Sequence, residues 1–110
     1  MKLPAEIIIP KSKLTRYLLV PRLKGDKSKF LAQAGFTLEE SPALDSALRK
    51  LVRDYDAVFD RADEYGTYYR VTGNLEGLNG LRLAVVTIWI ERTVNNSLQF
   101  VTLFPSKDKS

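Results

Sequence analysis

The 110-residue sequence contains no cysteine and no histidine, and it has a single tryptophan. The absence of cysteine excludes disulfides and thiolate metal sites, and the absence of histidine excludes imidazole ligands and the commonest general base. We therefore expect neither a metal nor a cofactor, and we expect a cytoplasmic protein, since a reducing compartment suits such a chain. We also expect no membrane association, because no stretch approaches the roughly 20 apolar residues of a membrane span.

The formal net charge of +4 hides an uneven distribution along the chain. Residues 1–29 hold eight Lys/Arg and two Asp/Glu, a balance of +6, whereas residues 30–66 hold four basic and eight acidic residues, a balance of −4. A basic N-terminal third favours contact with phosphates, as in RNA. The alternative is a solvated helical surface, because scattered surface lysines are common in proteins.

The longest apolar run spans residues 81–90 and is rich in β-branched and aromatic side chains. Such a run is typical of a strand that is apolar on both faces. At the edge of a sheet the same residues would recruit other chains. The sequence therefore predicts a central strand whose two faces are both covered.

Local signals predict helices before strands. A helix over residues 13–20 is capped by Ser12, a second over residues 27–34 is capped by Asp26 and closed by Gly35, and a third begins at Ser41-Pro42 and ends near residue 55. Strands are expected at residues 57–63, 68–75, 81–90 and 98–104. These elements predict an α+β fold, in which N-terminal helices precede a four-stranded antiparallel β-meander with a helix packed on one face. We expect one domain over residues 1–105 and a frayed polar tail over residues 106–110.

Three polar residues occupy positions where apolar ones would be expected. Lys27 falls on the edge of the apolar stripe of the second helix, where an ammonium either extends to solvent along its stem or serves a function. Thr87 and Thr102 interrupt the two most apolar strands. They are either structural hydroxyls that need buried partners or a pair that positions a phosphate or a substrate hydroxyl.

The pairing of the last two strands decides whether these two hydroxyls can act together. They share a sheet face if Thr87 lies opposite Thr102, or if Thr102 lies opposite Trp89, and they lie on opposite faces if Thr102 lies opposite Ile88. Asn95-Asn96 suits the positive φ values of a two-residue hairpin turn, which favours the pairings with a shared face.

Several short motifs resemble those of a small bacterial family, common in cyanobacteria, whose function is formally unassigned. The motifs are Lys2-Leu3-Pro4, Lys13-Leu14-Thr15-Arg16-Tyr17-Leu18-Leu19, Asp26-Lys27-Ser28-Lys29-Phe30, Gly35-Phe36, Tyr65-Gly66-Thr67, Tyr69, Gly73, Thr87-Ile88-Trp89-Ile90 and Val101-Thr102-Leu103-Phe104-Pro105. Members also resemble the C-terminal modules of polymorphic toxins, which are similar to metal-independent ribonucleases of the barnase, EndoU, colicin and RelE type. The resemblance implies a toxin-like ribonuclease in a toxin–antitoxin-like pair, with RNA and a small cognate, antitoxin-like protein as partners.

The resemblance also implies roles for individual residues. In metal-independent cleavage, a ribose 2′-hydroxyl attacks the adjacent phosphate and leaves a cyclic phosphate. Without histidine, Lys27 or Tyr69 would move protons, and Thr87 and Thr102 would orient the phosphate.

Cations would neutralise the phosphate charge in this scheme. Lys29 and Arg70 would do so at the reacting group, and Lys24 would join Lys27 and Lys29 in binding RNA.

The chain departs from the family where polar residues are common, with Val86, Gln99 and Phe104 in their places. Because these polar groups are missing, the chain fits either an active ribonuclease or a degenerate relative of one. A second hypothesis is a non-catalytic interaction module that binds a small cognate protein.

Overall fold

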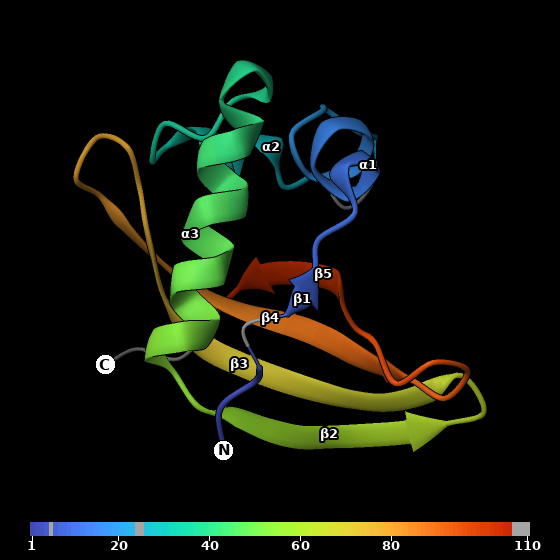
Figure 1. Ribbon diagram of the computed structural model, residues 1–110. Coiled ribbons are helices and arrows are strands. Elements are labelled where there is room, and N and C mark those ends of the chain that lie inside the picture. The colour runs from blue at the N-terminus through green and yellow to red at the C-terminus, as the bar shows by residue number, and fades with distance from the viewer. Residues whose placement is uncertain (5, 24–25, 107–110) are drawn as a thin grey trace.

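The computed structural model describes residues 1–4, 6–23 and 26–106. The helical elements are α1 (Lys11–Lys13), the π-helical η1 (Leu14–Leu18), α2 (Ser28–Ala32), the 3-10 turn η2 (Leu38–Glu40) and α3 (Ser41–Asp54). The strands are β1 (Ile7–Ile8), β2 (Ala57–Asp63), β3 (Gly66–Glu76), β4 (Arg82–Arg92) and β5 (Leu98–Pro105). They form one sheet in the order β1-β5-β4-β3-β2, and Figure 1 shows the helices gathered on one side of it. None of the helices in these ranges is long and apolar enough to cross a membrane.

The α+β class is confirmed, but the sheet has five strands rather than four. The additional strand is β1, which runs parallel to β5 and pairs Ile7 with Leu98 and Ile8 with Gln99. The remaining neighbours pair antiparallel, as expected for a meander. The sequence indicated an extended segment here but no sheet partner, because two residues carry no detectable period.

α3 follows the expected helix closely. Leu44, Leu48, Leu51 and Val52 are buried at helical spacing, and the helix ends one residue before Tyr55. The expected N-cap is shifted by one residue: Ser41 is already helical, because the η2 turn leads directly into α3 and places Glu40 at the N-cap.

The first N-terminal helical segment begins two residues earlier than predicted, with Ser12 inside it and not at its cap, and the second helix is shorter than predicted. Pro10 precedes α1, so the first helix begins at Lys11 and then widens into the π-helical η1. α2 covers only five residues. The Asp26 carboxylate does order its start, accepting hydrogen bonds from the Ser28 N–H over 2.8 Å and the Ser28 hydroxyl over 2.6 Å. Gly35 follows with a φ of 90°, as expected beyond a helix end.

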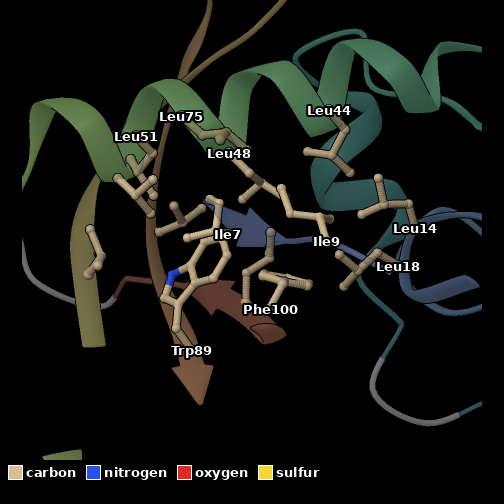
Figure 2. Packing of buried hydrophobic residues seen from close by; sticks show 14 of the residues in the cluster. Ile7, Ile9, Leu14, Leu18, Leu44, Leu48, Leu51, Leu75, Trp89 and Phe100 are labelled. Atoms are coloured by element: carbon tan, nitrogen blue, oxygen red, sulfur yellow. The ribbon is translucent and has the colours of Figure 1, made fainter. Parts of the chain in front are cut away.

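The main core lies between α3 and one face of the sheet. Figure 2 shows Leu48 and Leu51 of α3 above Trp89 and Phe100 of the sheet. The Trp89 and Phe100 rings meet edge to face with centroids 5.2 Å apart. The same cluster contains buried residues from the N-terminal segment with β1, from η1 and the residue after it, and from α2: Leu3, Ile7, Ile9, Leu14, Leu18, Leu19 and Leu31.

β4 is a central strand, as predicted, but the expectation that both of its faces are covered is wrong. Its inner face, toward α3, buries Leu83, Val85, Thr87 and Trp89. The opposite face carries Ala84, Val86, Ile88 and Ile90, of which Ala84 is exposed and Val86 and Ile88 are half-buried. We call this side of β2–β5 the outer face; no helix of the described ranges covers it (Figure 1).

The predicted pairing of the last hairpin is also wrong. Near the turn, Trp89 pairs with Phe100, but beyond it Ile88 pairs with Thr102. Val101 is thus an extra residue on β5, a β-bulge that shifts the register by one. Thr102 consequently points to the outer face while Thr87 points inward, so the two hydroxyls lie on opposite faces. The turn itself places only Asn96, not both asparagines, at positive φ.

β5 ends at Pro105, and the next residue is held rather than frayed. The Ser106 N–H donates a hydrogen bond to the Ala84 carbonyl over 2.8 Å. Residues 107–110 of the predicted tail lie outside the described ranges.

Candidate functional site

Three cations surround the side chain of Tyr17, which η1 presents half-exposed at the surface. The Lys27 ammonium donates a hydrogen bond to the Tyr17 hydroxyl over 3.2 Å and lies 5.2 Å from the ring centroid. The Arg22 guanidinium and the Lys13 ammonium lie 4.7 Å and 5.9 Å from the same centroid. Thr102 donates its hydroxyl hydrogen bond to the Leu103 carbonyl over 3.4 Å and also helps to lower the pKa of Tyr17, and we call these five residues the Tyr17 cluster.

The local structure explains how these residues meet. Lys13 and Tyr17 are four residues apart, so they share one side of the first helical segment. Lys27 directly precedes α2, whose first turn is ordered by Asp26. Thr102 directly follows the bulge at Val101, and the bulge turns its hydroxyl away from the core.

The electrostatics of the cluster favour negative charge on or beside the phenol oxygen. The hydrogen bond from Lys27, the Thr102 side chain and the nearby positive charges of Lys27 and Arg22 hold the pKa of Tyr17 below its ordinary range, against a smaller opposing effect of burial. In the described ranges, Lys27 has a phenol and no carboxylate as its partner. The cluster therefore has the composition of an anion site that also contains an ionisable hydroxyl.

The cluster lies at the border of the outer face. Thr102 pairs with Ile88, and Ile88 pairs with Arg70, so the three side chains form one row across β5, β4 and β3. Adjacent strands are about 4.8 Å apart, which separates the backbones of Thr102 and Arg70 by about 10 Å. Arg70 donates a hydrogen bond to the Asp60 carboxylate over 2.9 Å. The fold thus brings three predicted site residues, Lys27, Thr102 and Arg70, to one side of the sheet.

Two other predicted site residues lie on the inner face. Thr87 is fully buried: its hydroxyl donates to the Val71 carbonyl over 2.9 Å and accepts a hydrogen bond from the Trp89 indole N–H over 2.8 Å. Tyr69 pairs with Trp89 and packs against the core. The shared hydroxyl site expected of Thr87 and Thr102 is therefore absent, and neither Thr87 nor Tyr69 faces the Tyr17 cluster.

The remaining predicted residues are placed as follows. Lys29 is exposed on α2 and lines a separate shallow groove of about 210 Å³ with Leu19 and Phe36. Lys24 lies outside the described ranges.

The carboxylates near the end of α3 and along β2 are engaged with cations. Asp60 pairs with Arg70, and Asp63 with Arg61 over 3.2 Å. Asp54 pairs with Lys50 over 3.3 Å. Among the residues that the structure describes, no group of three or more acidic side chains is arranged to hold a metal ion.

Sequence reasoning missed Tyr17, which appeared within the motif of residues 13–19 but was given no role. The available signal was the spacing of four residues between Lys13 and Tyr17, followed by the basic stretch after Pro21. The hydroxyl's partners could not be found this way, because Lys27 and Thr102 reach it only through the tertiary fold.

Comparison with known proteins places all of these residues in one family. Residues 2–107 match the domain of unknown function DUF6883. The chain belongs to the DUF6883 family. This agrees with the resemblance of the sequence motifs to a family of unassigned function, and the DUF6883 match includes the Tyr17 cluster and both faces of the sheet. Neither a search of curated proteins nor one of solved structures gives a significant match.

Proposed function

We propose that this DUF6883 domain is a toxin-like, metal-independent ribonuclease, one member of a toxin–antitoxin-like pair, and that the Tyr17 cluster is its phosphate-binding and proton-transfer site. The observation that supports this proposal is the position of the Tyr17 hydroxyl between Lys27 and Thr102, with Lys13 and Arg22 beside its ring. Cations at this density suit a phosphodiester.

The chemistry follows from the groups present. The Tyr17 phenolate, made more accessible by its lowered pKa, accepts the proton of the ribose 2′-hydroxyl. The 2′-oxygen forms a bond to the adjacent phosphorus, and the bond from phosphorus to the 5′-oxygen breaks. The Lys27 ammonium donates a proton to that leaving oxygen. Thr102 donates a hydrogen bond to the phosphate, and the charges of Lys13 and Arg22 stabilise the additional negative charge of the transition state.

Tyr17 takes the role that the sequence suggested for Tyr69. An acid or base must lie within hydrogen-bonding reach of the proton it transfers. Both rings pack against the core, but Tyr69 lies on the inner face opposite Trp89, whereas the Tyr17 hydroxyl accepts a hydrogen bond from Lys27. Lys27 and Thr102 retain their suggested roles.

The experiment is an RNA cleavage assay in the presence of EDTA. We expect the parent chain to release fragments ending in a 2′,3′-cyclic phosphate. Tyr17→Phe and Lys27→Ala should each lower the rate by about 10²- to 10⁴-fold, as is typical for loss of a general acid or base. Lys2→Ala is a matched control, because Lys2 is an N-terminal lysine paired with Asp56. Cleavage that requires a divalent metal, or that persists in Tyr17→Phe at the parent rate, would contradict the proposal.

The alternative is a non-catalytic module that binds a small cognate protein. The edge strand β2 favours it, because Val58 and Phe59 are 53% and 60% exposed there. Unpaired strand edges are common docking sites for a partner strand. However, the β-bulge between Phe59 and Arg61 interrupts this edge and makes it a poorer template. Under the alternative, the parent chain would show no cleavage at all.

A further inference from the structure

The outer face carries an apolar surface that the chemistry proposed above does not use. It consists of Ala84, Val86 and Ile88 on β4 and Phe104 on β5, which we call the apolar patch. Phe104 is 40% exposed and lies opposite Val86. The described helices all lie on the other side of the sheet (Figure 1). An aromatic ring left open on a sheet face is a feature to be explained.

The apolar patch directly adjoins the Tyr17 cluster. Phe104 and Thr102 are two residues apart on the same strand and face, so their Cα atoms are about 7 Å apart. Thr102 is itself part of that cluster. A ligand whose charged group occupies the cluster would therefore lay its neighbouring atoms over Phe104 and Ile88.

The far side of the patch is polar and also contains cations. Arg70 pairs with Ile88 across the sheet and is held by Asp60. The Arg61 guanidinium lies 3.9 Å from the centroid of the Tyr68 ring. The patch is thus an apolar strip that has the cationic Tyr17 cluster on one side and the Arg70–Asp60 and Arg61–Asp63 ion pairs on the other.

We propose that the apolar patch binds the bases of single-stranded RNA, with Phe104 as the ring on which a base stacks, while an RNA phosphate occupies the Tyr17 cluster. This inference rests on the proposed function and specifies its substrate. A single strand alternates flat uncharged bases with charged phosphates, and proteins that bind such strands combine basic borders with aromatic platforms. In a duplex the faces of the bases are already stacked, so a duplex would offer this surface only its phosphates.

The test compares ligands with and without bases. The first probe is a short 2′-O-methyl oligoadenylate, in which the attacking oxygen is blocked so that binding is measured without cleavage. The second is an abasic oligomer of the same length and charge. The variants are Phe104→Ala and Phe104→Leu, and the matched control is Phe59→Ala, which removes a more exposed phenylalanine from the far edge strand β2.

We expect Phe104→Ala to weaken binding of the oligoadenylate by about 10-fold and to leave binding of the abasic oligomer within about 2-fold. Phe104→Leu keeps an apolar side chain but loses the ring, and it should weaken oligoadenylate binding similarly with an unchanged thermal midpoint. Phe59→Ala should change neither affinity. Lys27→Ala should weaken binding of both oligomers, because its contact is to phosphate.

Three results would overturn the inference. One is an equal loss for both oligomers in Phe104→Ala, which would mean that Phe104 only supports the cluster. The second is no loss for either oligomer, which would mean that Phe104 does not contact the bases. The third is a Phe104-dependent affinity for an oligoglutamate peptide equal to that for RNA, which would make the surface a protein-docking site. The ribonuclease proposal is tested by a different result. Binding that depends on the bases, without cleavage in the absence of metal, would contradict the ribonuclease proposal but support the stacking site.

Discussion

The Lys27 ammonium donates its hydrogen bond to the Tyr17 hydroxyl over 3.2 Å from a loop ten residues farther along the chain. The ammonium stabilises the phenolate more than the phenol. The pKa of Tyr17 is therefore lowered from its ordinary value.

The first prediction concerns this pKa. The sequence has five tyrosines, and Tyr17 should ionise at a lower pH than a tyrosine without such contacts. Lys27→Met should move the pKa of Tyr17 upward, toward its ordinary value, because the hydrogen bond and the charge are both lost. Absorbance titration of the phenolate band measures this shift, with Tyr17→Phe to assign the transition and Lys2→Met as control. An unchanged titration in Lys27→Met would contradict the interaction.

The lowered pKa of Tyr17 also makes the free energy of unfolding depend on pH. The folded state favours the phenolate, so the free energy of unfolding gains a contribution as the pH rises from the folded pKa toward the unfolded value. That contribution is lost as the pH falls through the folded-state pKa of Tyr17. Lys27→Met should therefore lower stability relative to the parent mainly in alkaline solution, which denaturant unfolding at two pH values can measure.

The second prediction concerns the buried hydroxyl of Thr87. Thr87→Val keeps the shape of the side chain but leaves the Trp89 indole N–H without its buried acceptor. We expect a loss of about 1–3 kcal/mol in the free energy of unfolding, measured by denaturant titration with tryptophan fluorescence. Thr72→Val is the matched control, since Thr72 is exposed on the outer face of β3. The free energy of unfolding of Thr72→Val should stay within about 0.5 kcal/mol of the parent value. Equal losses in the two variants would argue against the buried hydrogen bonds of Thr87.

The third prediction concerns salt. RNA held by phosphate contacts releases counterions, so affinity should fall steeply as salt rises from about 50 to about 200 mM. Lys27→Ala should reduce the slope of log affinity against log salt by about one, whereas Lys2→Ala should leave it unchanged. Fluorescence anisotropy of a labelled 2′-O-methyl RNA gives both slopes. Binding that is insensitive to salt would mean that the basic residues do not contact phosphate.

Local patterns were sufficient to predict α3 and the four long strands. The Ser41-Pro42 start and the leucines at helical spacing define α3, and alternating side chains define β3. Their order also gave the antiparallel meander. β1 was not predictable as a strand, because its two residues acquire a partner only when the N-terminal segment lies beside β5.

The candidate site was less predictable, because the extra residue Val101 decides which face of the sheet the Thr102 hydroxyl lies on. The buried residues of β5 are Leu98, Phe100 and Leu103, so their spacing changes from two to three across Val101. This change in spacing is the sequence signal of the bulge. The Asn95-Asn96 turn, however, suits a regular hairpin and favoured a pairing that puts Thr87 and Thr102 on one face. Thr102 was therefore placed beside Thr87 instead of beside Tyr17, whose contacts with Lys27 and Thr102 are entirely tertiary.

The central claim is that RNA binds the outer face and the Tyr17 cluster, and a methyl-labelled NMR titration with 2′-O-methyl oligoadenylate tests it most directly. Val86 and Ile88 report the outer face, while Val85 and Leu103 report the inner face of the same strands. The account predicts that the resonances of Val86, Ile88 and the Tyr17 ring shift together and saturably, with much smaller changes at Val85 and Leu103. Shifts confined to Val58 and its neighbours on β2, or shifts that leave Ile88 and Tyr17 unchanged, would contradict it.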